Sequence, residues 1–441
     1  MSALSQQDKN LATALVLGTL RWKLALDAEL LPLLTRPDVR LSNAIATTLE
    51  LGAFQLRHMD RIPVHAALDE SVELVRAAGQ SHATGMVNAI LRKLTLQKPP
   101  APKVFETPAQ LAERLGHPGW LVERWVKNYG LAAAKAICEY DQREPGTSPV
   151  AAAELSAPEP TTESAPVADV QFDKSSDETS LDIAPASVET SEPEPALEPT
   201  SEASPVVAVV RAEPAPVLVS GIDPGSRLVA ELTAALAPKS DSTLRVWDAC
   251  AAPGGKTRIL AELLPGAEVL ATDVSPRRMA VMAERLQRDG LSGQIRTEVA
   301  DAVELPTESG DFDLVLCDVS CSGTGTLARN PEIRLRLEPA HLSRQAKRQR
   351  EILLAALGRL KPGGRLVYST CSLEPEENEA VVERVLEKVT GISRVDLTQL
   401  VTEKLPGDIG AAVVRGGCLR TLPGANFAGD GFFAAAFERT V

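Results

Sequence analysis

The second half of the chain alternates apolar, strand-like runs with helical stretches, and this alternation restricts the possible folds more than any other feature. The strand-like runs lie at residues 244–249, 268–272, 294–299, 312–317 and 365–369, and the clearest helical stretches at 276–289 and 339–360. Such alternation is typical of right-handed βαβ units. The sequence therefore predicts a Rossmann-like parallel α/β sheet, with ligands bound beyond the carboxyl ends of its strands.

The first part of the chain has helical periodicity and no strand-like alternation. Apolar side chains recur at helical spacing in three stripes, which are Leu11, Leu15, Trp22 and Leu26, then Val64, Leu68, Val72 and Val75, then Val87, Ile90, Leu91 and Leu94. Stripes of this kind form the buried faces of amphipathic helices. We therefore predict an all-α helical bundle over residues 1–145, with nearly every one of these side chains in its core.

Between these parts lies a segment with the composition of a spacer. Residues 148–216 contain 11 prolines, a single aromatic residue, 14 acidic residues and 2 basic ones, so they cannot bury enough apolar surface to offset the entropy of ordering. We predict a disordered acidic linker over residues 146–216 and an α/β domain over residues 217–441. Because nearly all of the net charge of -13 falls in the linker, the acidic composition does not exclude a nucleic-acid partner.

The cysteine pattern and the absence of long apolar runs limit the protein class. The six cysteines are Cys138, Cys250, Cys317, Cys321, Cys371 and Cys418. They have neither zinc-type spacing nor the density of a secreted disulfide scaffold. No signal segment and no membrane-spanning run is recognisable. We expect a cytoplasmic protein with reduced thiols, no metal and no membrane association.

A loop rich in small residues follows the first strand-like run. It reads Asp-Ala-Cys-Ala-Ala-Pro-Gly-Gly-Lys-Thr over residues 248–257, and its small residues let the backbone approach a ligand closely. A phosphate-binding P-loop requires glycine where Cys250 stands, and the dinucleotide fingerprint is absent. The loop therefore favours a ligand that lacks phosphates.

Acidic residues follow three successive strands. Asp273 ends the second run, Asp301 follows the third, and Asp318 ends the fourth. An acid after the second strand of such a sheet is suited to hold a ribose diol. A single acid here is more often a strand-end or capping residue, but three in register beside the small-residue loop favour a nucleoside such as S-adenosylmethionine.

Two cysteines complete the predicted site. Cys321 follows the fourth strand and Cys371 the fifth, so both are expected at the edge of the sheet where the ligand binds. A thiolate that adds to carbon 6 of cytosine makes carbon 5 nucleophilic, and a second group must later remove the carbon 5 proton. Two cysteines and an aspartate meet this requirement, whereas the alternative is a pair of small buried core residues.

These residues resemble a known family. The strings CAAPGGKT, DVSCSGTG, RNPEIR, KPGGRLVYSTCSLEPEENE and GDGFF resemble bacterial RNA (cytosine-5) methyltransferases of the RsmB/Sun type, nearly continuously over residues 217–441. The string VNAILRK, residues 87–93, is similar to the NusB-like RNA-binding domain that is fused to those enzymes.

The resemblance implies a role for each matching position. Cys371 takes the place of the nucleophile, Cys321 that of the cysteine that releases the product, and Asp318 would face the target base. Arg329 is a weaker candidate for an RNA contact. Contacts to S-adenosylmethionine are implied for Cys250, Ala251, Ala252, Pro253, Gly254, Gly255, Lys256, Asp273, Arg278, Asp301 and Asp318.

The chain departs from the family pattern in two places. Ser320 stands before Cys321 where the family has proline. DNA cytosine methyltransferases use the cysteine of that Pro-Cys pair as nucleophile, so the change disfavours a DNA substrate and favours Cys371. The family also has a folded RNA-contacting segment between its two domains, and here residues 142–145 are interpreted as its remnant.

The resemblance implies an S-adenosylmethionine-dependent enzyme that methylates carbon 5 of a cytosine in 16S rRNA, protein-free or early in assembly. We expect a monomer whose partner is RNA and not DNA. The same chemistry on tRNA or another RNA remains an alternative, as does a non-catalytic RNA-binding factor in ribosome assembly. An amino-group methyltransferase is disfavoured because it would leave both cysteines unexplained.

Overall fold

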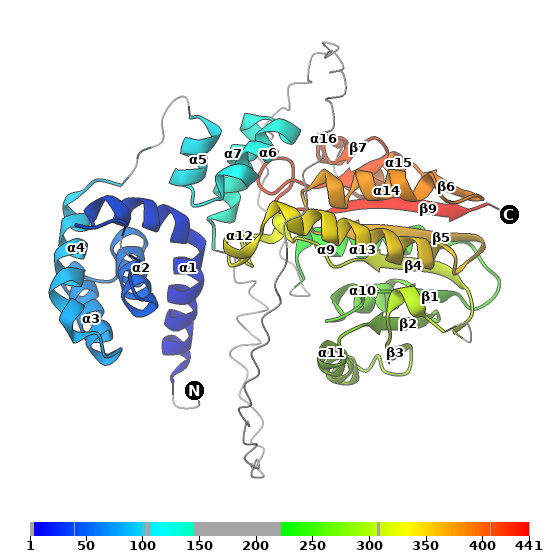
Figure 1. Cartoon of the computed structure of the whole chain (residues 1–441). Helices are drawn as coiled ribbons and strands as arrows, with labels where there is room; N and C mark the ends of the chain where they lie inside the picture. Colours follow the sequence, from blue (N-terminus) through cyan, green and yellow to red (C-terminus); the bar gives the residue numbers. More distant parts are fainter. Residues whose placement is uncertain are drawn as a thin grey trace, which may run out of the picture.

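The computed structural model describes residues 4–38, 40–99, 101, 106–144, 222–306, 309–405 and 407–440. The predicted linker, residues 146–216, lies outside them. The described parts form a helical bundle, a smaller helical unit and an α/β domain, as Figure 1 shows from blue through cyan to red. Among the described helices, none has both the length and the apolar character needed to cross a membrane.

The bundle forms where the three apolar stripes predicted it. Its helices are α1 (Gln6–Leu30), α2 (Asn43–His58), α3 (Val64–Ala77) and α4 (Thr84–Leu96). Gly18 allows α1 to pack closely on α2, because a Cβ there would lie 2.0 Å from the Phe54 ring. Leu11 and Val64 are 44% and 52% exposed, so their predicted place in the core is wrong. Both lie near the starts of their helices, where the rest of the bundle leaves them uncovered.

The α/β domain contains one nine-stranded sheet in the described part of the chain, in the order β3-β2-β1-β4-β5-β9-β8-β7 with β6 beside β9. The strands are β1 (Arg245–Asp248), β2 (Glu268–Asp273), β3 (Ile295–Val299), β4 (Phe312–Asp318), β5 (Leu360–Thr370), β6 (Ile392–Val395), β7 (Val414–Arg415), β8 (Cys418–Arg420) and β9 (Phe433–Arg439). Strands β1 to β5 are parallel, as predicted.

The sheet as a whole is mixed, because four strands that the sequence did not indicate, β6 to β9, extend it beyond β5. Strand β9 runs antiparallel to β5, β6 and β8, and β7 is antiparallel to β8. The connection from β8 to β9 has no helix among its residues, and a parallel neighbour requires a crossover that is usually helical. The chain therefore returns in the opposite direction.

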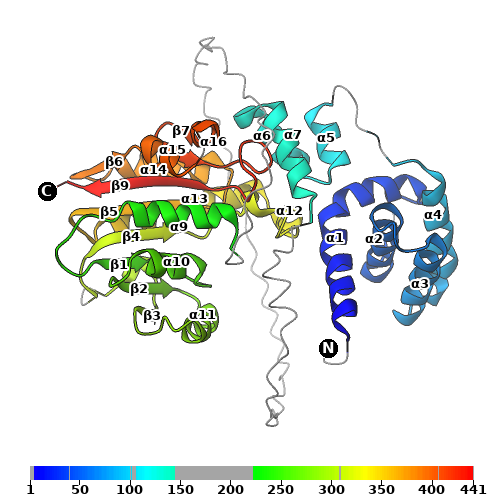
Figure 2. The same cartoon turned by 180° about the vertical axis from the view of Figure 1, so that it is seen from behind.

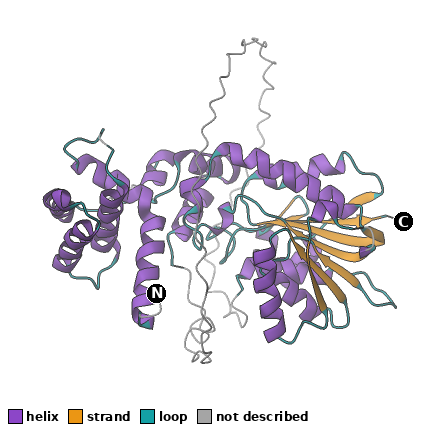
Figure 3. Cartoon of the chain, turned by 60° about the horizontal axis from the view of Figure 1, so that its bottom comes forward, coloured by secondary structure: helices purple, strands orange, loops and turns teal. Residues whose placement is uncertain are grey.

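Helices cover both faces of the sheet (Figure 3). On one face lie α9 (Pro224–Ala235), α10 (Gly255–Leu263), α11 (Pro276–Arg288) and α15 (Thr398–Lys404), and on the other α13 (Pro339–Leu357) and α14 (Glu379–Leu386). The cause is that successive side chains of a strand point to opposite faces of the sheet. In β1, Val246 packs in the core beneath the α9 side and its neighbour Trp247 packs in the core beneath the α13 side. Figure 1 shows the α13 side and Figure 2 the α9 side.

A smaller helical unit joins the bundle to the α/β domain. It comprises α5 (Pro108–Arg114), α6 (Gly119–Tyr129) and α7 (Leu131–Asp141). Its buried side chains, among them Trp125 and Ile137, share a core with Leu327 and Leu373 of the α/β domain. The structure therefore differs from the expectation that only residues 142–145 remain of a connecting segment. Residues 108–141 form a folded one.

A buried arginine fixes this joint. Arg334 of the short helix α12 (Ile333–Arg336) is 2% exposed and donates to the backbone carbonyls of Arg21, Gly116, Asp141 and Leu327. Arg21 of α1 in turn donates to the carbonyl of Ala328 at 2.9 Å. One side chain thus connects all three units and holds α12 in place between them.

The same joint makes stability depend on pH. Asp141 is fully buried with one oxygen 3.2 Å from His117 Nε2, and burial raises the pKa of Asp141 to about 7. In the unfolded chain this carboxyl titrates near 4, so between these values the folded state binds more protons. Its contribution to stability is present at low pH and is lost as pH rises toward 7.

We expect Asp141→Asn to remove this dependence, because the amide can donate to His117 and cannot ionise. The difference in unfolding free energy between variant and wild type should move in favour of the variant from pH 5 to pH 8, by up to about 1.4 kcal/mol per pH unit. Urea unfolding at both pH values measures it. A difference that stays constant would contradict the prediction.

Candidate active site

The carboxyl edge of the parallel strands begins with the small-residue loop after β1. Gly254 has φ 96°, and a Cβ there would lie 2.9 Å from Met282 Cγ, so only glycine fits at the start of α10. Asp248 accepts a hydrogen bond from Thr257 Oγ1 at 2.7 Å, and burial raises its pKa to about 7. Burial also raises the pKa of Cys250, so this thiol is not suited to be a nucleophile.

Two acids follow the neighbouring strands. Asp273 ends β2, accepts the Ser275 N–H at 2.9 Å and lies 3.3 Å from the guanidinium of Arg278, which also donates to the carbonyl of Ala252. Arg278 thus connects the small-residue loop to β2. Asp301 follows β3 and pairs with Arg348 of α13. Partial burial would raise the pKa of Asp301, but its hydrogen bonds to Arg348 and to the N–H of Val303 outweigh this and lower it.

The chemistry of these groups fits S-adenosylmethionine. Asp273 and Asp301 place carboxylates at the ends of adjacent strands, where they can accept from a ribose diol and an adenine amino group. Lys256, the cation of the loop, is hydrogen-bonded to Asp318 and Ser226. The loop therefore has no free ammonium group that could bind a phosphate. Asp273, Asp301, Arg278 and the backbone of residues 250–255 would hold the cofactor, whose chemistry is to supply an electrophilic methyl group.

Lys256 and Asp318 form the charged centre of the site. Lys256 Nζ donates to Asp318 Oδ2 and to Ser226 Oγ, each at 2.7 Å, and Ser369 Oγ donates to Asp318 Oδ1 at 2.5 Å. Burial would lower the pKa of Lys256, but the Asp318 carboxylate outweighs it, with a further contribution from Cys371, and the pKa is raised. Lys256 is therefore a stable cation at the carboxyl edge of the parallel strands.

The two predicted cysteines meet. Cys321 Sγ and Cys371 Sγ are 3.3 Å apart, although the residues belong to loops after different strands. The hydrogen bond to Cys371, together with burial, raises the pKa of the Cys321 thiol well above its usual value. Cys321 therefore holds its proton and can donate it toward the sulfur of Cys371. Ser320, which replaces the proline of the family pattern, has its carbonyl fixed by Gln349 Nε2 at 3.0 Å.

Glu377, a residue that the sequence did not single out, connects the two cysteine loops. It lies in the turn η6 (Pro375–Glu377) and is fully buried. It accepts from Ser322 N at 2.9 Å and from Gln349 Nε2 at 3.0 Å, and also from Ser322 Oγ and Ser372 Oγ. Because one carboxylate binds both residues that follow the cysteines, it sets how the two loops lie relative to each other.

We expect Glu377→Gln to lower kcat by roughly tenfold to hundredfold. The amide nitrogen of the glutamine would face groups that donate hydrogen bonds, so the two cysteine loops would shift, and small displacements of reacting groups lower the rate strongly. Loss of a buried, charge-assisted acceptor should also lower stability by about 2 kcal/mol. Methyl-transfer kinetics and urea unfolding measure both. The neighbouring Glu376→Gln, at a half-exposed side chain with one ion pair, is the matched control and should have a much smaller effect. Equal losses in the two variants would contradict the role of Glu377.

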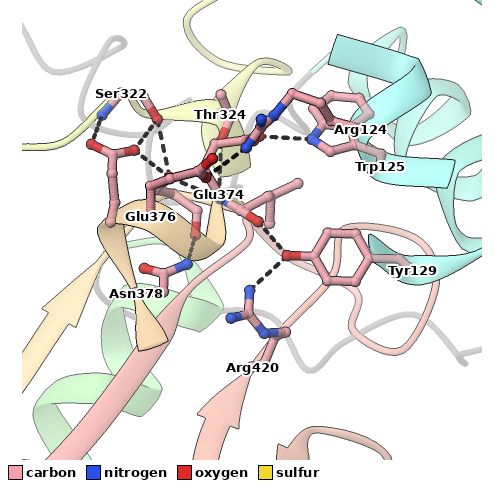
Figure 4. Close-up of polar contacts among 12 residues, drawn as sticks. Arg124, Trp125, Tyr129, Ser322, Thr324, Glu374, Glu376, Asn378 and Arg420 are labelled. Atoms are coloured by element: carbon pink, nitrogen blue, oxygen red, sulfur yellow. Dashed lines mark hydrogen bonds and ion pairs between the residues drawn. The ribbon is translucent and has the colours of Figure 1, made fainter. Parts of the chain in front are cut away.

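Helix α6 clamps the segment that follows Cys371 (Figure 4). Trp125 Nε1 and Arg124 Nε donate to the two oxygens of the buried Glu374, at 3.0 and 2.8 Å. The hydroxyl of Tyr129 donates to the carbonyl of Leu373 and accepts from Arg420 at 2.8 Å. The connecting helices thus help to hold the nucleophile loop, which the sequence alone gave no means of seeing.

The weaker RNA candidate, Arg329, is engaged in two ion pairs. Its guanidinium is 3.1 Å from Asp223 Oδ1 and 3.1 Å from Asp430 Oδ2. Asp223 caps α9 through the N–H groups of Gly225 and Ser226. The arginine thus links α9 to the loop before β9, and Ser226 of the same turn accepts from Lys256.

Family models match both the α/β domain and the N-terminal bundle. The family model for the 16S rRNA methyltransferase RsmB/F matches residues 233–438, and that of the NusB family matches residues 1–96. The probable ribosomal RNA small subunit methyltransferase B of Bacillus subtilis (strain 168) is 32% identical over 440 residues, which are 99% of this chain and 92% of the relative.

Two further comparisons extend over most of the chain. The ribosomal RNA small subunit methyltransferase B of Enterobacter sp. (strain 638) is 31% identical over 98% of this chain and 91% of its own. The crystal structure of PH0851 has a similar fold, with a TM-score of 0.66 and 21% identity over 99% of this chain and 91% of that one. The chain therefore belongs to the RsmB/F family of S-adenosylmethionine-dependent methyltransferases and has a NusB-family domain at its N-terminus.

Proposed function

We propose that this protein methylates carbon 5 of a cytosine in small-subunit rRNA through a covalent bond between Cys371 and carbon 6 of the base. The observation that supports this most is the pair of thiols, 3.3 Å apart, beside the Lys256–Asp318 ion pair. A transfer to a hydroxyl or amino group would need no second thiol. A methyl transfer to carbon 5 needs one group to add and another to remove a proton.

The first step is addition of the Cys371 thiolate to carbon 6, which forms a carbon–sulfur bond and moves the electrons of the carbon 5–carbon 6 double bond toward carbon 5. The Cys321 S–H lies 3.3 Å from Cys371 Sγ and can donate a hydrogen bond to it, and Lys256 is the cation of the site. Asp318 keeps Lys256 in place and would face the base. The nucleophilic carbon 5 then accepts a methyl group.

Release requires a base for the proton on carbon 5. While Cys371 is free, the hydrogen bond between the two sulfurs is the largest cause of the raised pKa of Cys321. In the covalent adduct Cys371 is a thioether, so this cause is absent, and in the proposed mechanism Cys321 then gives its proton to solvent. The Cys321 thiolate then removes the carbon 5 proton, the double bond re-forms and Cys371 leaves as thiolate. One proton is released per turnover, and both cysteines return to their starting states.

Small-subunit rRNA is the proposed substrate because the two curated relatives described above are named for it. The NusB-family domain supports RNA as the partner. The target cytosine must be single-stranded or flipped out of a helix for a thiol to reach carbon 6.

The test is transfer of labelled methyl groups from S-adenosylmethionine to protein-free small-subunit rRNA and, in parallel, to bulk tRNA, followed by digestion to nucleosides. We expect label in 5-methylcytidine from rRNA. Label from tRNA alone would overturn the proposed substrate and keep the chemistry. Label in another nucleoside would overturn the chemistry. No label, despite measurable cofactor binding, would favour a role in assembly without catalysis.

A further inference from the structure

A surface pocket of about 500 Å³ opens next to Cys321, and none of the residues expected to hold the cofactor lines it. We call it the Cys321 pocket, and its lining residues are Cys321, Ser322, Ile333, Arg336, Leu337, His341, Arg344 and Gln345. Its volume lies within the range of about 300–1,000 Å³ that is usual for small-molecule sites, so a nucleotide fits. The lining comes from the Cys321 loop, α12 and the first turns of α13.

Both helical walls of the Cys321 pocket are fixed from behind. Helix α12 is held by Arg334 through backbone carbonyls of three units of the protein. Helix α13 is tied to the Cys321 loop by Gln349, which donates to the carbonyl of Ser320 and to Glu377. The pocket is therefore built before any ligand arrives, which lowers the entropic cost of binding.

The charge of the pocket is positive. Arg336 and Arg344 line it and no acidic side chain does. Arg336 is 72% exposed, with a weak contact of 3.8 Å to Glu332 one turn earlier. Within the described ranges no ion-pair partner is found for Arg344, which is exposed. Exposed guanidinium groups without strong partners are suited to bind phosphate oxygens.

We propose that the Cys321 pocket receives the stretch of RNA that adjoins the target cytosine, with Arg336 and Arg344 bound to its phosphates. This rests on the proposed function, and it identifies where RNA enters the site. The strand would approach the thiols along α12 and α13, whereas the residues expected to hold the cofactor follow β1, β2 and β3. Phosphate contacts of this kind position the strand and carry no base preference.

The experiment compares the wild type with Arg336→Ala/Arg344→Ala in the full-length protein. The dissociation constant for a short single-stranded RNA is measured by fluorescence anisotropy at several salt concentrations. We expect binding at least about tenfold weaker and a salt dependence reduced by roughly 0.7 per lost phosphate contact. KM for RNA should rise in step, while binding of S-adenosylmethionine is unchanged. Replacing Arg344 by lysine instead of alanine keeps the charge, so this variant should show part of the salt dependence that the double alanine variant loses.

Arg296→Ala is the matched control, because Arg296 is 73% exposed with one ion pair, to Glu298, and lies on the edge strand β3. It should leave RNA binding and methylation as in the wild type. Unchanged RNA affinity and salt dependence in the double variant, with an active wild type, would overturn the pocket proposal alone. A wild type that binds RNA and does not methylate it would overturn the proposed function. If Arg296→Ala weakened RNA binding equally, the affinity would depend on the overall charge of the protein and not on the pocket, which would also overturn the pocket proposal.

Discussion

Replacement of Cys371 by alanine is expected to abolish methyl transfer, with a loss of at least about 10⁴-fold in kcat/KM, because no other thiol can take its place. Cys321 Sγ is 3.3 Å away, but it belongs to the loop after β4 and not to the loop after β5, so it is not placed to add to carbon 6 in the same way. Binding of S-adenosylmethionine should remain within about twofold, since Asp273 and Asp301 are untouched. Methyl-transfer assays and calorimetric titration of the cofactor measure the two quantities.

Cys418→Ala is the matched control for this variant. Cys418 is a free cysteine of the same domain, is 4% exposed on β8 and takes no part in the thiol pair. Its alanine variant should retain methyl transfer. If Cys371→Ala retained more than about a tenth of the activity, a covalent bond through this residue would be excluded.

Replacement of Cys321 by alanine is expected to trap the enzyme on its substrate. Addition and methylation need only Cys371, so the reaction should proceed until the carbon 5 proton has to leave. A covalent protein–RNA adduct should accumulate in near-stoichiometric amount, and it should survive denaturing electrophoresis because its carbon–sulfur bond cannot break without that deprotonation.

The double variant Cys321→Ala/Cys371→Ala separates this outcome from adventitious crosslinking, since it should give no adduct. Labelled methyl should be present in the trapped complex of the single variant. If Cys321→Ala turned over normally without an adduct, another base would remove the proton, and the only role left to Cys321 would be its hydrogen bond to Cys371.

Much of the candidate site could be predicted from the sequence. Asp273, Asp318, Cys321 and Cys371 each follow a strand whose apolar pattern is local, and the carboxyl ends of parallel strands meet at one edge. Their convergence therefore follows from topology, which short-range patterns indicate. The antiparallel side of the sheet was missed, since β7 and β8 span only two and three residues and show no alternation.

The sequence could not show which side chains hold these groups in position. Lys256 stands in a loop expected to bind the cofactor, and only the fold shows its ammonium bound to Asp318 and Ser226. Glu377 lies among other glutamates in a polar stretch, and nothing local distinguishes the buried Glu374 and Glu377 from the partly exposed Glu376 and Glu379.

By itself the sequence determined the helical and α/β parts of the chain and the edge of the sheet where the reactive residues lie, because periodicity and strand ends are local properties. The tertiary structure alone decided how the parts meet. Arg124 reaches Glu374 across 250 residues of sequence, and Arg334 reaches the carbonyl of Arg21 across 313. Such contacts depend on where a folded surface presents a buried acceptor, and no spacing along the chain encodes that position.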